Sequence, residues 1–105
     1  MAVIIEKNDE IWTIVLHRPE VRNAVDQSTR ELLQDAFDGF ENDTKARVAV
    51  LWGKGGHFCS GADLKAMSDP SRRKIIDPEG QGTGPMGPTR TPISKPVIAA
   101  VSGYA

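Results

Sequence analysis

Runs of β-branched and aromatic residues alternate with polar breaks along the first part of the chain. The runs Val3–Glu6 and Ile11–Leu16 flank the polar segment Lys7–Glu10, and this pattern predicts a β-hairpin. Pro19 lies just beyond the second run. Because proline has no backbone N–H to donate to a neighbouring strand, it predicts the end of the second strand.

A helical periodicity follows between Asp26 and about Glu41. Its apolar residues recur at the three- and four-residue spacing that places them on one helix face. They are Leu32, Leu33, Ala36, Phe37 and Phe40, with Arg30, Glu31, Gln34, Asp35 and Asp38 expected on the solvent face. Asp26 or Ser28 is expected to cap the start, since Ser28 stands at capping-box spacing from Glu31. Asn23 is interpreted as part of the helix entry, and Asn42-Asp43 as its end.

Two later runs, Val48–Trp52 and Pro96–Val101, are apolar without alternation. This pattern is typical of interior parallel strands that are covered on both faces. Such coverage needs helices on two sides of the sheet, and the only other helix candidate is a short one near Leu64–Met67. The sequence therefore predicts an α/β fold with an unfinished core. We expect these 105 residues not to fold stably without partners on the apolar faces.

Glycine and proline are concentrated between Ser68 and Pro92, where they occupy nine of twenty-five positions. Such a segment does not sustain a helix or a central strand. We therefore expect residues 68–92 to form a mobile loop within a single domain that spans residues 1–105.

Composition narrows the class of protein. Hydrophobic residues make up 39% and charged residues 26% of the chain, as in soluble globular proteins, and the formal net charge of -1 argues against a nucleic-acid surface. No apolar run approaches the roughly 18 residues of a membrane helix. The single cysteine, Cys59, agrees with a reducing compartment, and we expect a cytoplasmic protein. No Cys/His cluster has metal-ligand spacing, so no metal is expected.

Three stretches carry the clearest functional signal. They are Leu16–Ala24 (LHRPEVRNA), Phe58–Lys65 (FCSGADLK) and Lys95–Ala105 (KPVIAAVSGYA). In this order and spacing they resemble the crotonase (enoyl-CoA hydratase/isomerase) superfamily. That family has an N-R-P-x-x-x-N-A turn, an F-x-x-G-x-D-[LI] signature and a strand leading into a glycine-rich segment. The resemblance implies the N-terminal part of a crotonase-like ββα spiral, with an opening hairpin, an amphipathic helix and buried parallel strands.

The second stretch has a chemical rationale of its own. An enolate formed from a thioester needs N–H donors fixed where negative charge develops on the carbonyl oxygen. A loop with Gly61 that leads into a helix supplies such donors, with Asp63 near the helix start and Leu64 and Met67 facing the core. The resemblance implies that the Ala62 backbone N–H is one of two oxyanion-hole donors. An ordinary strand-to-helix turn is the alternative interpretation.

The resemblance also implies a set of contacts with the acyl-CoA substrate. These residues are Val21, Arg22, Ala24, Ser60, Ala62, Asp63, Leu64 and Lys65. Arg22 is a candidate for a CoA phosphate because its planar guanidinium suits one. Glu20 stands where many relatives carry a basic residue, so this phosphate contact stays open. Lys65 resembles a position near the adenine, and a solvated helix lysine is the equally good alternative.

The activity implied by the resemblance is that of an acyl-CoA enzyme, most commonly the addition of water to a 2-enoyl-CoA. The acid/base glutamates and the second oxyanion donor of the family lie beyond Ala105, so residues 1–105 alone are expected to be inactive. Isomerase or thioester hydrolase activity, a non-catalytic CoA-binding or assembly fragment, and an unrelated small α/β domain are the alternatives. No cofactor is implied beyond coenzyme A as part of the substrate. The implied assembly is a homotrimer or a dimer of trimers.

Overall fold

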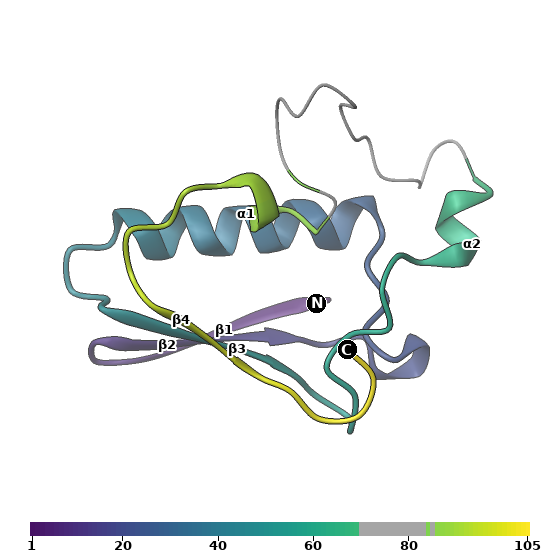
Figure 1. Cartoon of the computed structure of the whole chain (residues 1–105), viewed down its shortest axis with the longest axis horizontal. Coiled ribbons are helices and arrows are strands. Elements are labelled where there is room, and N and C mark those ends of the chain that lie inside the picture. The colour runs from purple at the N-terminus through teal and green to yellow at the C-terminus, as the bar shows by residue number, and fades with distance from the viewer. Residues whose placement is uncertain (70–83, 85) are drawn as a thin grey trace.

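The computed structural model describes residues 1–69, 84 and 86–105, which form a four-stranded sheet with a long helix across one face (Figure 1). The elements in chain order are β1 (Val3–Asn8), β2 (Ile11–Leu16), the 3-10 turn η1 (Pro19–Val21), α1 (Gln27–Asn42), β3 (Val48–Gly53), α2 (Leu64–Met67), the 3-10 turn η2 (Pro88–Arg90) and β4 (Val97–Ala100). The order of the strands across the sheet is β1-β2-β3-β4. The predicted α/β class is confirmed.

The hairpin and the two parallel crossovers build this sheet. β1 pairs antiparallel with β2, while β2–β3 and β3–β4 are parallel pairs. The hairpin turn is tighter than predicted, because β1 continues to Asn8 and pairs it with Ile11. Asp9, at the turn, has a φ of 56°, a left-handed conformation that Asp tolerates better than most residues.

Helix α1 begins where the sequence predicts, and Asp26 caps it. The Asp26 side chain accepts a hydrogen bond from the Thr29 N–H at 2.9 Å, which satisfies one of the unpaired donors of the first turn. The predicted Ser28–Glu31 capping box is wrong, since the Ser28 hydroxyl donates to Asp26 instead. At the other end, the Lys95 ammonium donates to the carbonyls of Phe40 and Asp43 at 2.8 and 2.6 Å.

The core lies between α1 and the sheet. Phe40 is fully buried, and its ring centroid is 5.9 Å from that of Trp12 on β2. Ile14, Leu33 and Phe37 pack into the same cluster. Burying side chains of this size contributes roughly 1.5–3 kcal/mol each. Arg30 was expected on the solvent face of α1, and that expectation is wrong, because only 5% of it is exposed.

The other face of the sheet is open. β3 is an interior strand, as predicted, but Trp52 on it is 38% exposed. β4 lies at the edge of the described sheet, and Ile98, which is on the same face as Trp52, is 56% exposed. Val97 is on the α1 side, where it lines an apolar cavity, and it is 40% exposed. β4 was expected to be an interior strand, and that expectation is wrong within the described sheet, where β4 is at the edge. The chain was also expected to lack the helices needed to cover both faces, and among the described helices only α1 lies across the sheet. These exposed apolar side chains agree with the prediction that the core is unfinished.

The glycine- and proline-rich segment is described only in part. Residues 70–83 and 85 lie outside the described residues, so the expected mobility of 68–92 stays a prediction. Gly84 and Gly87 form an antiparallel bridge, η2 follows, and Met86 and Ile93 pack against the core. None of the described helices has the length and apolar character needed to cross a membrane.

Candidate oxyanion site

The loop that enters α2 lies against the segment that enters α1. Val25 and Ala62 form a parallel bridge, although 36 residues separate them. The Val25 N–H donates to the Gly61 carbonyl at 2.8 Å, and the Asp63 N–H donates to the Val25 carbonyl at 2.9 Å. The first and second sequence motifs therefore meet here. We call residues 18–26 and 54–63 together the motif junction.

This bridge fixes the direction of the Ala62 N–H. In a planar trans peptide the C=O and the following N–H point in opposite directions. Because the Gly61 carbonyl points at Val25, the Ala62 N–H points away from it. None of the described residues accepts a hydrogen bond from this N–H. Gly61 reaches the required backbone geometry with a φ of 101°, which residues with a Cβ rarely adopt.

Asp63 connects the loop to α2. Its side chain accepts a hydrogen bond from the Ala66 N–H at 3.1 Å and so caps the helix. The predicted short helix is confirmed, with Ala66 buried. The expectation that Leu64 and Met67 face the core is wrong, because they are 79% and 53% exposed. In this four-residue helix the inward position is taken by Ala66.

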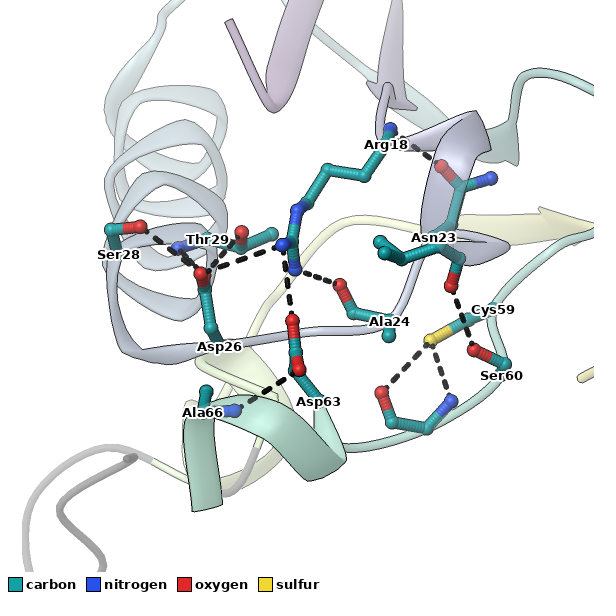
Figure 2. A network of polar contacts seen from close by, with 12 residues as sticks. Arg18, Asn23, Ala24, Asp26, Ser28, Thr29, Cys59, Ser60, Asp63 and Ala66 are labelled. Carbon is teal, nitrogen blue, oxygen red and sulfur yellow. Dashed lines mark hydrogen bonds and ion pairs between the residues drawn. The ribbon is translucent and has the colours of Figure 1, made fainter. Parts of the chain in front are cut away.

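Arg18 joins both halves of the motif junction (Figure 2). Its Nη1 donates to the Ala24 carbonyl at 2.5 Å, and its Nη2 donates to an Asp63 carboxylate oxygen at 3.0 Å. The same Nη2 lies 3.6 Å from an Asp26 carboxylate oxygen. All three charged side chains are largely buried, since 7–14% of each is exposed. Arg18 therefore holds the entry segments of α1 and α2 together.

The pKa values of both carboxylates in this cluster are lowered, so both are ionised at neutral pH. Burial is the largest influence on the pKa of Asp63 and raises it, but hydrogen bonds from Ala66 and Arg18 and the Arg18 charge together leave this pKa below its ordinary value. The pKa of Asp26 is also lowered, with burial opposed by hydrogen bonds from Thr29 and by the Arg18 charge. A general base or acid for neutral pH needs a pKa nearer 7. The cluster is thus suited to holding backbone rather than to proton transfer.

Asn23 occupies the centre of the motif junction. It is 1% exposed; its Oδ1 accepts from the Arg18 N–H at 2.7 Å, and its Nδ2 donates to the carbonyls of Lys54 and His57 at 3.0 and 2.8 Å. Its interpretation as an N-cap is wrong, because the capping position of α1 belongs to Asp26. Arg22 and Asn23 both have left-handed backbones, with φ of 51° and 59°.

Several residues predicted to contact CoA also lie together. The Ser60 N–H donates to the Arg22 carbonyl at 3.0 Å, and the Ser60 hydroxyl donates to the Val21 carbonyl at 3.2 Å. Ala24, in the same turn, is buried. Arg22 and Lys65 are exposed, and neither forms an ion pair within the part of the chain that the structure describes.

The third motif runs beside the second. The Phe58 N–H donates to the Ser102 carbonyl at 2.8 Å, and the Cys59 N–H donates to the Tyr104 carbonyl at 3.0 Å. Tyr104 also stacks on His57, with ring centroids 4.6 Å apart, and its N–H donates to the His57 Nδ1. All three stretches singled out in the sequence therefore converge on residues 57–63.

An apolar cavity of about 270 Å³ lies next to this loop. α1, the sheet, residues 58–59 and residues 86–93 contribute to its walls, with Leu33, Leu51, Phe58 and Ile93 among the lining side chains. Cys59 lines it as well and is 8% exposed, which fits the small buried residue of an apolar wall. Within the described residues no group of three His, Cys, Asp or Glu side chains is arranged to hold a metal ion.

The sequence did not predict the pairing of Arg18 with Asp63 or the contact of Arg18 with Asp26. Arg18 lies in the first motif and Asp63 in the second, but they are 45 positions apart, and neither pattern indicates that the two side chains pair. One signal could have indicated this pair: the first motif contains a basic residue, the second contains an acidic residue, and both motifs were expected to form one site.

A family model described as "Enoyl-CoA hydratase/isomerase" matches residues 6–105. The mevalonyl-coenzyme A hydratase of Aspergillus fumigatus is 39% identical over 94 residues, which cover 90% of this chain and 34% of that protein. The carnitinyl-CoA dehydratase of Proteus mirabilis is 38% identical over 97 residues, covering 90% of this chain and 36% of the relative.

Solved structures agree with these relatives. A crystal structure of an enoyl-CoA hydratase from Mycobacterium tuberculosis superposes with a TM-score of 0.87 at 39% identity, over 99% of this chain and 39% of that one. A carnitinyl-CoA dehydratase from Mycobacterium avium gives 0.84 at 36% identity, over 97% and 40% of the two chains. The chain thus spans between about a third and two fifths of the proteins it matches.

Proposed function

Because this chain belongs to the enoyl-CoA hydratase/isomerase family, we propose that it supplies one half of the oxyanion site of an acyl-CoA hydratase. The observation that carries this proposal is the Ala62 N–H, which points away from the Val25 bridge and has no acceptor among the described residues. An N–H in this state is ready to donate to a thioester oxygen. Coenzyme A enters only as part of the substrate.

The chemistry assigned to this donor is the stabilisation of an enolate. When water adds to C3 of a 2-enoyl thioester, the electron pair of the double bond moves toward the thioester carbonyl and negative charge develops on its oxygen. A proton then returns to C2 and gives the 3-hydroxyacyl thioester. A donor already fixed by the protein stabilises this charge without reorganising during the reaction. The second donor and the acid/base groups belong to the remainder of the complete fold.

The nucleotide end of the substrate is assigned to the surface beside the motif junction. Arg22 and Lys65 are exposed and form no ion pair within the described residues, so both are available to phosphate oxygens. Val21, Ala24 and Ser60 form the turn between them, and Asp63 and Leu64 begin α2 at the same place. The apolar cavity beside Cys59 is assigned to the acyl chain.

Relatives named as hydratases and dehydratases favour hydration and its reverse over the isomerase and thioester hydrolase alternatives. The assembly proposed for this enzyme is a homotrimer or a dimer of trimers, and the proposed location is the cytoplasm. A second candidate function is a non-catalytic CoA-binding or assembly fragment. The observation that favours it is that Arg18 and Asn23 join the two halves of the motif junction by hydrogen bonds within this chain.

The test uses the complete enzyme, in which residues 1–105 are followed by the rest of the family fold. Ala62→Pro removes the N–H and is expected to lower kcat by about 10²–10³-fold, whereas Ala62→Ser keeps the N–H and most of the activity. Turnover is followed by the loss of the conjugated enoyl-thioester absorbance. An amide-to-ester replacement at residue 62 removes the N–H without the proline ring.

Binding of a CoA thioether, which has no carbonyl oxygen, serves as the control for folding. Full turnover by a folded Ala62→Pro enzyme that binds this thioether would contradict the oxyanion assignment. The fragment hypothesis makes a different prediction, because residues 1–105 alone would then bind coenzyme A without turning over any enoyl thioester.

A further inference from the structure

Two peptide groups lie in series between a buried guanidinium and the proposed donor. Arg18 Nη1 donates to the Ala24 carbonyl, and the N–H of the same peptide group, that of Val25, donates to the Gly61 carbonyl. The N–H of this second peptide group is that of Ala62. Because C=O and N–H point in opposite directions in each trans peptide, the two groups are aligned head to tail. The positive charge of Arg18 stands at one end of this chain and the Ala62 N–H at the other.

We propose that Arg18 is a positioning residue of the oxyanion site, which orients and polarises the Ala62 N–H through the Ala24–Val25 and Gly61–Ala62 peptide groups. The proposal rests on the function assigned to Ala62 above. Hydrogen bonds in series polarise one another, so a charged donor at the start of the chain strengthens the donor at its end. Arg18 does not touch the substrate in this arrangement.

Asp63 fixes the same peptide from its other side. Its carboxylate pairs with Arg18 at 3.0 Å, and its N–H donates to the Val25 carbonyl at 2.9 Å. Ala62 is thus held between two hydrogen bonds to Val25, and both segments are attached to one guanidinium. A single ammonium group cannot reproduce this, since a lysine lacks the fork that reaches a carbonyl and a carboxylate together.

The experiment compares Arg18→Met, Arg18→Lys and Lys45→Met in the complete enzyme. For Arg18→Met we expect kcat to fall by about 10–10²-fold, the order of effect that a displaced catalytic group produces, with KM changed less than about threefold. Arg18→Lys is expected to recover part of kcat because it restores the charge. Lys45, in an exposed ion pair with Asp9, is the control and should leave both constants unchanged.

A spectroscopic measurement separates positioning from general stability. The infrared stretch of a ¹³C-labelled thioester carbonyl falls when strong donors bind the oxygen. At saturation, Arg18→Met is expected to shift this stretch back toward its value in water, while affinity for the CoA thioether stays within about threefold. If Arg18→Met is too unstable to purify, the pair Arg18→Met with Asp63→Asn avoids leaving the Asp63 carboxylate unpaired and carries the same expectation.

The outcomes distinguish this inference from the proposed function. Unchanged kcat and carbonyl stretch in a folded Arg18 variant, beside an inactive Ala62→Pro enzyme, would overturn the role of Arg18 alone. An active Ala62→Pro enzyme would show that the Ala62 N–H is not the oxyanion donor, which would contradict the proposed function as well. Loss of kcat together with loss of thioether binding would mean that Arg18 acts only through the fold.

Discussion

The motif junction and strand β4 differ in how much of their environment this chain provides. At the motif junction, Asn23 and Asp63 are 1% and 6% exposed. Asn23 forms hydrogen bonds to both halves of the junction, and Asp63 accepts one from α2. On β4, Val97 and Ile98 are 40% and 56% exposed. The described residues therefore satisfy the polar groups of the motif junction, whereas they leave the apolar side chains of β4 partly exposed.

The largest stability effect is expected at Asn23. Asn23→Ala leaves the Arg18 N–H and the carbonyls of Lys54 and His57 without their partner, and it places alanine at a φ of 59°. We expect a loss of about 3 kcal/mol in the free energy of unfolding of the complete enzyme. Urea denaturation measures it, with Asn42→Ala at the exposed end of α1 as control. A loss below about 1 kcal/mol would show that the junction is held without Asn23.

The effect of a substitution at Ile98 on β4 is expected to differ between the 105-residue chain and the complete enzyme. In the 105-residue chain, Ile98→Lys replaces an exposed apolar side chain at a sheet edge, and we expect less self-association with little loss of stability. In the complete enzyme, where this side chain is expected to be buried, the same change should cost at least about 2 kcal/mol. Sedimentation velocity and urea denaturation measure the two effects. Equal tolerance in both contexts would mean that β4 stays uncovered in the complete fold.

Acid should weaken the motif junction before it affects β4, which has no titratable side chain. The pKa of Asp63 is lowered in the folded state, so this carboxylate contributes stability above its unfolded pKa. That contribution is lost as the pH falls below about 4, toward the folded pKa. The measurement is the free energy of unfolding against pH, with Asp63→Asn as the comparison. If the two proteins have the same slope in this window, Asp63 does not carry the effect.

The smallest effect is expected for the ion pair between Lys45 and Asp9, which lies outside both regions. Its atoms are 3.0 Å apart, but the two side chains are 68% and 80% exposed. Exposed pairs of this kind contribute about 0–1 kcal/mol, so Lys45→Ala should change the free energy of unfolding by less than about 0.5 kcal/mol. A larger change in urea denaturation would indicate that surface charges matter as much as the buried Arg18 cluster.

Periodicity alone predicted the hairpin, α1, α2 and both later strands to within about two residues of their ends. It failed for side chains whose burial depends on distant segments. The helical periodicity predicts that Arg30 faces solvent, but Gly87 packs against the helix at this residue. A Cβ on Gly87 would lie 2.7 Å from the Arg30 carbonyl oxygen. Trp52 and Ile98 fail in the opposite sense, because an apolar pattern states a preference for burial and not the element that provides it.

The candidate site was predictable where a short motif contains it. Gly61 and Ala62 were identified from one stretch, and the left-handed backbone of Gly61 agrees with that interpretation. The direction of the Ala62 N–H was beyond the sequence, because it depends on a bridge to Val25. The Arg18–Asp63 pair was beyond it for the same reason, since no local pattern brings residues 45 positions apart into contact.

The order of strands in the sheet is the same as their order in the chain. Each strand therefore finds its neighbour already synthesised when it leaves the ribosome, and no strand has to insert between two that are already paired. A sheet that forms in the order of synthesis would extend from the hairpin toward β4, where the Ile98 side chain is 56% exposed. During synthesis, this exposed apolar edge would be a binding site for a chaperone until another segment pairs with it.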